Sequence, residues 1–293
     1  MIEFQNVTFR YSLPDSAAYE GAAGEDKARF TNVIENFSLT IDDGEFVCLL
    51  GPNGCGKTTL GKLINGLLLP SDGRILVDGF SAADGDELFK VRQLAGMVFQ
   101  DPSRQLVAST VEDELAFGPE NLGVPPEEIR ERIDWALKIL KLEPLRNCEP
   151  HYLSGGQTQR VAVASVLVMH PRYVVMDEPT AMLDPEGRRS VLETVDFLRS
   201  SLGMGIIYIT HHMEEVLHCD RVVALEHGGI SFDGPPDELF CRPELLESLG
   251  LRIPPLVQLI NLLNKSGWNL PMDFSWENTA EAIADNLRKK KHS

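Results

Sequence analysis

Apolar and polar residues alternate along Ile2–Arg10 and again along Phe37–Ile41, which is the period-two pattern of half-buried β-strands. The stretch between them, Leu13–Arg29, is rich in Ala, Gly, Ser and Asp and shows no periodicity. Such a stretch has no regular face to bury, so we expect a surface insertion there. The chain is therefore predicted to begin with two strands that are separated by a loop excursion.

Apolar runs without alternation mark a second kind of strand. The run Phe46–Leu50 is continuously apolar, and a glycine-rich loop and a helical pattern follow it, with apolar positions at Leu60, Leu63, Ile64 and Leu67. Two similar runs are Tyr173–Met176 and Gly205–Ile209. Continuous apolar strands are buried on both faces, as in a parallel sheet that helices cover. The pattern predicts an α/β fold with a parallel-sheet core.

Between Gln100 and His170 the strand patterns stop. Helical patterns replace them along Thr110–Phe117, Glu127–Leu140 and Ser154–Met169. We interpret residues from about 101 to 170 as a helical subdomain that is inserted into the sheet domain.

The C-terminal part, residues 243–293, is predicted to be a helical extension of a domain that spans residues 1–242. A helix that starts near Pro255 would carry one apolar stripe, made of Leu256, Leu259, Ile260 and Leu263. A second helix, after the candidate N-cap Ser275, would place on one face Trp276, Ala280, Ile283, Ala284 and Leu287. A single helix cannot bury such a stripe. The stripes either pack onto their own domain or contact another subunit.

Charge and cysteine content exclude several classes of function. The 293 residues include 27 Lys and Arg against 44 Asp and Glu, which gives a net charge of −17 with neutral histidines. This charge repels phosphate backbones and anionic lipids, so we expect no nucleic-acid partner and no direct lipid insertion. The five cysteines are scattered without a C-x-x-C pair, which argues against a disulfide framework or a zinc site. No apolar run is long enough to span a membrane, and MIEFQNVTF does not have the pattern of a signal peptide.

A phosphate-binding loop follows the first buried strand. Its residues match G-x-x-x-x-G-K-S/T: Gly51, Pro52, Asn53, Gly54, Cys55, Gly56, Lys57, Thr58 and Thr59. The glycines let backbone N–H groups turn toward a phosphate, and the helix that starts near Lys57 adds its positive end. Lys57 supplies a cation for the β- and γ-phosphates, and Thr58 offers a hydroxyl group to Mg²⁺. We interpret Cys55 as a small residue tolerated in the loop and not as a nucleophile.

Two acidic residues, Asp177 and Glu178, end the strand Tyr173–Met176. The first carboxylate can hold Mg²⁺ through water, and the second can orient or deprotonate an attacking water. On its own such a pair is more often a helix N-cap or a solvated loop. Together with the phosphate-binding loop it indicates hydrolysis of a nucleoside triphosphate.

The pentapeptide LSGGQ, Leu153–Gln157, resembles the signature of the ATP-binding cassette (ABC) ATPases. Its serine and glycines open a helix, so a hydroxyl group, backbone N–H groups and the helix dipole face an anion. The resemblance implies a P-loop NTPase fold with a parallel-sheet core, an antiparallel β subdomain, an inserted helical subdomain and a C-terminal extension. It also implies that the signature binds the γ-phosphate of ATP on the opposite subunit, through Ser154, Gly155, Gly156 and Gln157.

Further positions match the motifs of the ABC ATPases. The resemblance implies that Gln100, at the end of the strand MVFQ, contacts Mg²⁺ and water, and that Asp184 belongs to a loop crossing the dimer interface. It implies that His211 contacts the γ-phosphate and that Tyr11 stacks on adenine. His212 receives no role. The implied substrate and cofactor are ATP and Mg²⁺, with Thr58, Gln100 and Asp177 near the metal.

Within the ABC ATPases, the stretch Val98–Val124 closely resembles the A component of energy-coupling-factor (ECF) importers, most specifically at Phe117–Asn121. The tail from Pro235 resembles the C-terminal extension of that group, which contributes to contacts between cassettes. A conventional ABC importer remains the alternative. A chromosome or repair ATPase is disfavoured because only roughly a hundred residues separate Lys57 from the signature, too few for two long coiled-coil arms.

The resemblance implies a motor subunit on the cytoplasmic face of the cell membrane, attached through protein partners. Two such subunits, identical or paralogous, would sandwich ATP. They would drive a transmembrane coupling protein and a substrate-binding membrane protein that import a vitamin or a transition-metal ion. The sequence leaves open which substrate is transported and what the insertion Leu13–Arg29 does.

Overall fold

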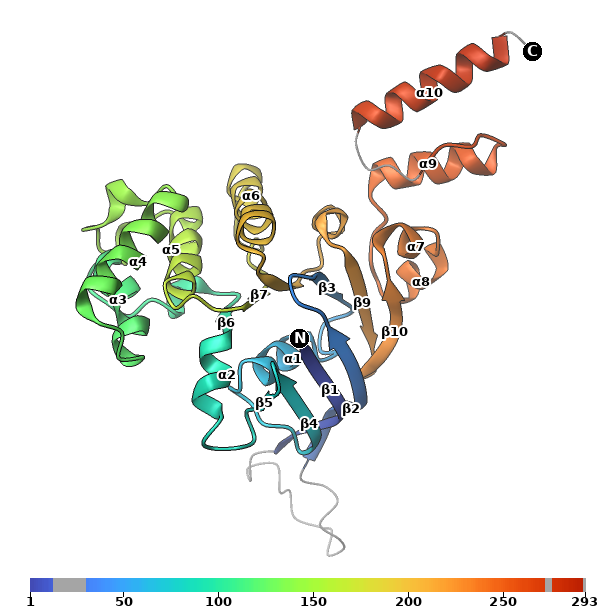
Figure 1. The fold of residues 1–293 in the computed structure, drawn as a ribbon. Helices are drawn as coiled ribbons and strands as arrows, with labels where there is room; N and C mark the ends of the chain where they lie inside the picture. The colour runs from blue at the N-terminus through green and yellow to red at the C-terminus, as the bar shows by residue number, and fades with distance from the viewer. Residues whose placement is uncertain (13–29, 272–275, 292–293) are drawn as a thin grey trace, which may run out of the picture.

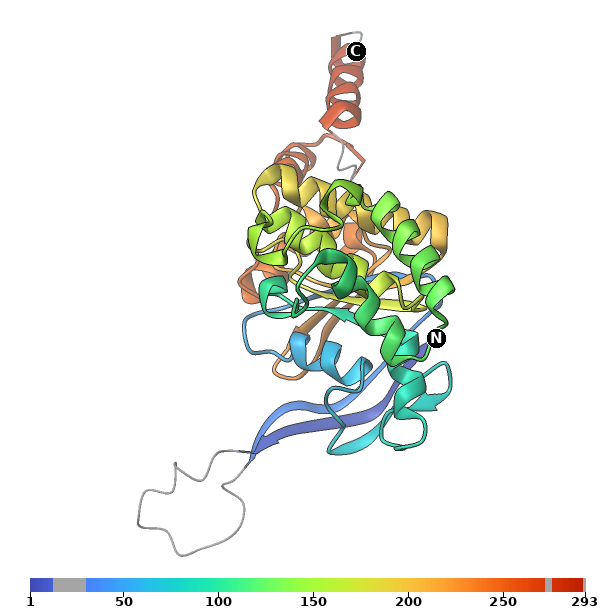
Figure 2. The ribbon, with the colours of Figure 1, turned by 90° about the vertical axis from the view of Figure 1, so that its left-hand side faces the viewer.

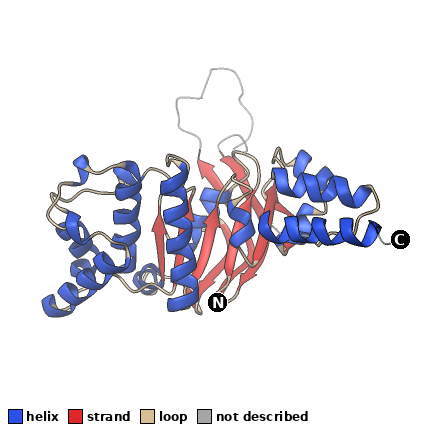
Figure 3. Ribbon diagram, turned by 90° about the horizontal axis from the view of Figure 1, so that it is seen from above, coloured by secondary structure: helices blue, strands red, loops and turns tan. Residues whose placement is uncertain are grey.

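The chain folds around two β-sheets, with helices on the outer sides (Figures 1 and 3). The computed structural model describes residues 1–12, 30–271 and 276–291, so the expected insertion Leu13–Arg29 and the expected N-cap Ser275 lie outside the described residues. The smaller sheet is antiparallel, in the order β2 (Phe30–Ile41), β1 (Ile2–Ser12), β4 (Asp72–Val77), β5 (Phe80–Ser81). The larger has the order β10 (Gly229–Gly234), β9 (Arg221–Glu226), β3 (Phe46–Leu50), β8 (Gly205–Ile209), β7 (Tyr173–Asp177), β6 (Ala95–Val98).

All strand pairs of the larger sheet are parallel except the pair of β9 and the edge strand β10. The helices are α1 (Lys57–Ile64), α2 (Leu88–Leu94), α3 (Val111–Asn121), α4 (Pro126–Ile139), α5 (Gly155–Leu167), α6 (Pro185–Leu202), α7 (Pro236–Phe240), α8 (Pro243–Ser248), α9 (Pro255–Lys265) and α10 (Trp276–Lys291). Figure 1 shows α3, α4 and α5 as a group beside the β6 edge of the larger sheet, and in Figure 2, which is viewed from that side, these helices lie in front of the strands. These elements confirm the predicted α/β class with its parallel core and antiparallel β subdomain.

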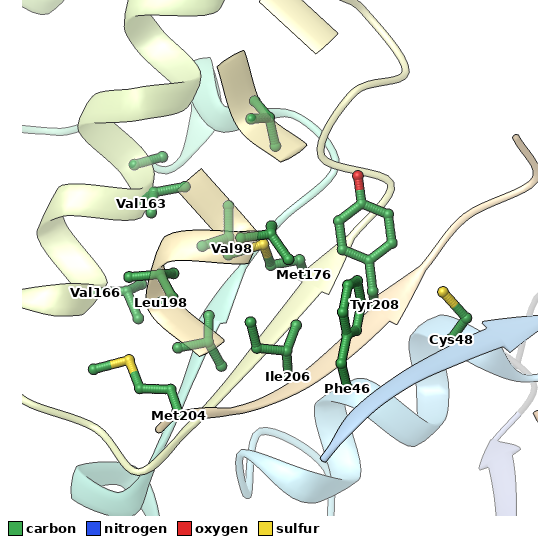
Figure 4. Packing of buried hydrophobic residues seen from close by; sticks show 14 of the residues in the cluster. Phe46, Cys48, Val98, Val163, Val166, Met176, Leu198, Met204, Ile206 and Tyr208 are labelled. Atoms are coloured by element: carbon green, nitrogen blue, oxygen red, sulfur yellow. The ribbon is translucent and has the colours of Figure 1, made fainter. Parts of the chain in front are cut away.

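The two faces of the larger sheet belong to two different cores. On β3, Val47 and Leu49 point into a core shared with the antiparallel sheet and α1, whereas Phe46, Cys48 and Leu50 point into a core shared with α3 to α8. Figure 4 shows the second core, in which side chains of α5 and α6 pack on strand residues. This double burial explains why the central strands are continuously apolar.

Several predicted boundaries are wrong, each for a local reason. Helix α1 ends at Ile64 because Gly66 has φ +70°, so Leu67 is 46% exposed and does not continue the apolar stripe. Strand β6 ends at Val98, so Gln100 is not part of it. The second strand begins at Phe30 and not at Phe37. The sequence patterns had not shown β4, β5, β9 and β10.

The extension buries the predicted stripes only in part, because Leu263 and Ile283 also pack against the cluster described next while other stripe residues do not. Val257 of α9 joins the core under α7 and α8, while Leu256 and Ile260 form a small cluster with Leu270, against which α10 packs. Part of both predicted stripes lies in solvent: Leu259 is 37%, Trp276 60% and Leu287 49% exposed, and Ala280 is exposed as well. Figure 1 shows α9 and α10 projecting away from the body of the molecule.

Helix α5 lies very close to the edge strand β6. A Cβ atom added at Gly96 would come 2.2 Å from Cγ1 of Val166, which is a stiff β-branched side chain. Only a glycine lets the helix rest on the strand at this distance. The contact sets the position of α5 relative to the sheet edge.

We expect Gly96→Ala to lower the free energy of unfolding by about 1–3 kcal/mol, as overpacking in a closed core does. The midpoint of thermal unfolding should fall by several degrees. Gly85→Ala is the matched control, because a Cβ atom there meets nothing within 4 Å and the backbone needs no positive φ. Equal unfolding midpoints for the two variants would show that the helix and strand are free to separate.

Candidate active site

The glycine-rich loop after β3 forms a tight cradle whose shape depends on its glycines. Gly51 has φ +139°, and a Cβ atom there would lie 2.3 Å from the carbonyl oxygen of Leu225. Gly54 and Gly56 also have positive φ, at +82° and +109°. Lys57, the first residue of α1, donates from Nζ to the carbonyl oxygens of Gly51 at 2.8 Å and Pro52 at 3.0 Å. The ammonium group therefore lies folded against the loop, where a phosphate can replace the carbonyl partners.

Thr58 and Asp177 meet beside this loop. The hydroxyl group of Thr58 donates to Oδ1 of Asp177 at 3.1 Å, and Asp177 is only 4% exposed at the end of β7. Burial raises the pKa of the Asp177 carboxyl group, the charge of Glu178 raises it further, and the Thr58 hydrogen bond opposes both. A buried carboxylate next to a hydroxyl group is a pair of hard oxygen ligands that suits Mg²⁺.

Two residues from neighbouring strand ends contact the carboxylate group of a third. Nε2 of Gln100 donates to Oε2 of Glu178 at 2.8 Å, and Nδ1 of His211 lies 3.4 Å from Oε1. Gln100 follows β6, Glu178 follows β7 and His211 follows β8, so the parallel order of these strands brings them together. Glu178 also has φ +46°, a left-handed conformation that costs a glutamate energy. The surrounding structure therefore holds this side chain in a defined place.

A cavity of about 810 Å³ gathers most of the predicted residues. Its walls contain Tyr11, Gly51, Pro52, Asn53, Gly54, Gly56, Lys57, Thr58, Thr59, Gln100, Glu178 and His211. The hydroxyl oxygen of Tyr11 lies 3.3 Å from Oγ1 of Thr59, which keeps the aromatic ring at the edge of the loop. Cys55 does not line the cavity: it is 6% exposed, and its sulfur lies 3.8 Å from Nζ of Lys57. Asp177 lies behind Thr58.

The signature residues line a different cavity, of about 670 Å³. Ser154 caps α5, and the side chain of Gln157 accepts in return from the backbone N–H of Ser154. Asp184 caps α6 by accepting from the N–H of Gly187 at 2.8 Å. The predicted residues in this second cavity are Ser154, Gly155, Gly156, Gln157 and Asp184, and none of them lines the first.

Sequence reasoning missed residues in both cavities. Val33 and Leu249–Leu251 line the first, and the basic residues Lys141, Arg160 and Arg189 line the second. Leu249–Leu251 follows α8 without a motif of its own, so only the fold places it there. Arg160 and Arg189 lie on α5 and α6, which begin at two of the predicted motifs, so the sequence offered a signal for these two residues. Lys141 follows α4 and had no such signal.

The chain matches the family model described as "ABC transporter" over residues 34–181. It is 45% identical over 274 residues to the energy-coupling factor transporter ATP-binding protein EcfA1 of Clostridium novyi, with 94% of each chain covered. It is 47% identical to the EcfA1 protein of Clostridium perfringens, again over 274 residues and 94% of each chain.

Among solved structures, CbiO1 from Clostridium perfringens, part of the ABC transporter complex CbiONQ, superposes with a TM-score of 0.71 at 34% identity. The match covers 89% of this chain and 98% of that one. A dimeric ATP-binding cassette bound to ADP and Pi gives a TM-score of 0.69 at 28% identity, covering 80% and 99%.

The chain belongs to the ABC transporter family, whose ATPases bind ATP and couple its hydrolysis to transport. Within that family its similarity is to the ATP-binding subunits of energy-coupling factor transporters, which confirms the resemblance drawn from Val98–Val124 and the tail.

We expect Lys57→Ala to weaken ATP binding at least about tenfold, because a charge-assisted hydrogen bond contributes about 1.5–3 kcal/mol. Titration of the purified subunit with a fluorescent ATP analogue measures this. Lys90→Ala, which removes an exposed lysine of α2, should leave the affinity unchanged and controls for net charge. Equal affinities of the two variants would contradict a role of Lys57 in phosphate binding.

Proposed function

We propose that the chain is the ATP-hydrolysing motor subunit of an ECF-type importer. The observation that carries this proposal is the convergence of Gln100, Glu178 and His211 at the open side of the phosphate-binding loop. A loop that only binds a nucleotide does not need a carboxylate held beside the γ-phosphate position. The substrate is a vitamin or a transition-metal ion, and other subunits recognise it.

Each residue has a separate task in the proposed reaction. Lys57 and the loop N–H groups balance the charge of the β- and γ-phosphates, and Tyr11 stacks on the adenine ring. Thr58, Asp177 and Gln100 would hold Mg²⁺, which would supply further charge neutralisation when bound. Glu178 orients the attacking water and accepts its proton. His211 donates a hydrogen bond to the γ-phosphate.

The reaction needs two subunits, identical or paralogous. The signature cavity is separate from the phosphate cavity of the same chain, so its N–H groups and its lysine and arginines have no phosphate partner within one subunit. In a head-to-tail pair, the N-terminus of α5 faces the γ-phosphate of the other subunit. Asp184 would lie at the same interface.

The extension is proposed to add to the contact between the subunits. Leu259, Leu262, Trp276 and Leu287 are all more than a third exposed on α9 and α10. The helices α9 and α10 project beyond the body of the cassette (Figure 1), and a second copy of the extension or that of a paralogue would cover these exposed apolar side chains.

Membrane attachment is proposed to run through protein contacts on the cytoplasmic face. No helix in the described ranges is long and apolar enough to cross a bilayer. The segment Gln100–Pro119 carries exposed apolar side chains, with Val107 71% and Phe117 55% exposed. A transmembrane coupling protein would dock there and drive a substrate-binding membrane protein, whereas the charge of −17 provides no attraction to anionic lipid.

We expect Glu178→Gln to keep ATP binding and to lower turnover by about 10²–10⁴-fold, since the amide keeps the shape but cannot accept the proton of water. The ATPase rate of the purified transporter complex measures this, and nucleotide titration verifies binding. Glu131→Gln, an exposed acidic residue of α4 that lines neither cavity, is the control for loss of charge. Near-normal turnover of Glu178→Gln would overturn the assignment.

We expect Ser154→Arg to lower turnover of the complex by about 10²-fold or more while the isolated subunit binds ATP normally. The arginine obstructs a γ-phosphate that belongs to the other subunit. Tyr152→Arg, two residues earlier and 83% exposed, introduces the same side chain outside the cavity and is the matched control. If the isolated Ser154→Arg subunit lost ATP binding, signature and loop would act within one chain.

A further inference from the structure

A completely buried carboxyl group lies behind His211. Glu215 is 0% exposed and begins a short 3-10 helix, Glu215–His218, that follows β8. Its Oε2 accepts from the hydroxyl group of Thr210 at 2.6 Å, and its Oε1 accepts from the hydroxyl group of Thr180 at 2.5 Å. Both threonines are themselves 1% exposed. Glu215 does not line either of the two large cavities.

Further donors surround the same carboxyl group. Nε of Arg188 lies 3.6 Å from Oε1 of Glu215, within ion-pair distance. Burial raises the pKa of the Tyr208 hydroxyl group, and the charge of Glu215 raises it further, so this group stays a neutral donor. In Figure 4 its oxygen points away from the apolar side chains around it. In the described part of the chain, neither Arg188 Nε nor the Tyr208 hydroxyl group has a hydrogen-bond partner.

The groups held by Glu215 come from the segments that carry the reaction. Thr210 directly precedes His211, and its Oγ1 also accepts from the backbone N–H of His212 at 3.0 Å. Thr180 follows Glu178 by two residues, and its carbonyl oxygen accepts from the N–H of Leu183 at 3.1 Å. One side chain therefore ties the end of β8 to the segment after β7.

Arg188 extends this connection to α6. It lies in the first turn of that helix, and its backbone N–H donates to the carbonyl oxygen of the N-cap residue Asp184 at 2.9 Å. The cluster thus joins the segment of His211, the segment of Glu178 and the segment of Asp184. The first two belong to this subunit's nucleotide site and the third to the interface with the other subunit.

Burying a carboxyl group costs free energy. Transfer of such a group from water is unfavourable unless hydrogen bonds replace its hydration, and apolar side chains of similar size fill a core at lower cost. Hydrogen bonds from two hydroxyl groups fix direction as well as distance, which apolar packing does not. The arrangement therefore specifies where the ends of β7 and β8 stand relative to each other.

We propose that Glu215 is a positioning residue for ATP hydrolysis, which holds His211 in register with Glu178 and with the loop of Asp184. This inference rests on the function proposed above. Glu215 does not touch the nucleotide and acts through Thr210 and Thr180. Without it, His211 and Glu178 would still be present but would no longer be held at a common γ-phosphate.

The test compares Glu215→Gln with Glu214→Gln in the purified transporter complex. Glu214 is the exposed neighbour of Glu215, so the two variants lose the same charge from the same segment. We expect Glu215→Gln to lower kcat about tenfold or more and to change the KM for ATP less than about twofold, because orientation and not binding is lost. Glu214→Gln should match the unsubstituted complex.

A double-mutant cycle with His211→Ala distinguishes a role of Glu215 in positioning His211 from a general loosening of the protein structure. Because Glu215 also holds the Glu178 segment through Thr180, adding Glu215→Gln to His211→Ala should lower kcat by a smaller factor than Glu215→Gln does in the unsubstituted complex. If the double variant lowered kcat by the product of the two single-variant factors, the proposal would be overturned. A Glu215→Gln complex with normal kcat would overturn it as well. If His211→Ala and Glu178→Gln alone left turnover intact, the proposed function itself would have failed.

Threonine variants keep the proposal testable if Glu215→Gln does not fold. Thr210→Val removes the hydroxyl group at nearly constant volume and should lower kcat about as much as Glu215→Gln does. Thr210→Ser keeps the hydroxyl group and should restore most of kcat. Equal kcat values for Thr210→Val and Thr210→Ser would overturn the proposed link.

Discussion

The parallel register of β6, β7 and β8 is the constraint on which the site depends. Val98 of β6 pairs with Met176 of β7, and Asp177 pairs with Ile209 of β8. The backbone N–H of Glu178 donates to the carbonyl oxygen of Ile209 at 2.9 Å, which continues the register one residue beyond the strand. A slip of one residue would exchange the two faces of a strand and would move a candidate catalytic side chain away from the loop. Because both faces are buried, each strand is held in this register.

How much of this arrangement the sequence reveals depends on whether a signal is local. The phosphate-binding loop, the acidic pair and the signature are each contiguous, and the strands before them are apolar runs, so their positions in the chain could be predicted. The end of β6, by contrast, was predicted wrongly. The strand ends where its pairing with β7 stops, at Val98. The hydrophobic pattern of MVFQ contains nothing that marks this stop.

Contacts between distant segments could not be predicted in the same way. Glu215 lies in the segment MEEVL beside another glutamate, and no periodicity distinguishes the buried one from the exposed one. Its burial depends on Thr180, which is 35 residues away. The burial of Val257 was missed for a related reason: α9 packs this residue against the cassette, a contact that a stripe drawn on an isolated helix does not contain. Local pattern gives the elements, and tertiary contact decides which face each one buries.

The close approach of α5 to Gly96 has a consequence for how two nucleotides influence each other. The N-terminus of α5 bears Ser154, and farther along the same helix Val166 rests on β6, four residues before Gln100. In the proposed pair of subunits, a helix placed in this way would connect the nucleotide bound by one subunit with the segment of Gln100 in the other. Thermodynamic linkage makes such a coupling reciprocal. If one bound nucleotide changes the affinity of the second site through α5, the second nucleotide changes the affinity of the first site by the same factor. In the proposed pair, neither nucleotide would therefore change the affinity for the other without its own affinity being changed by the same factor.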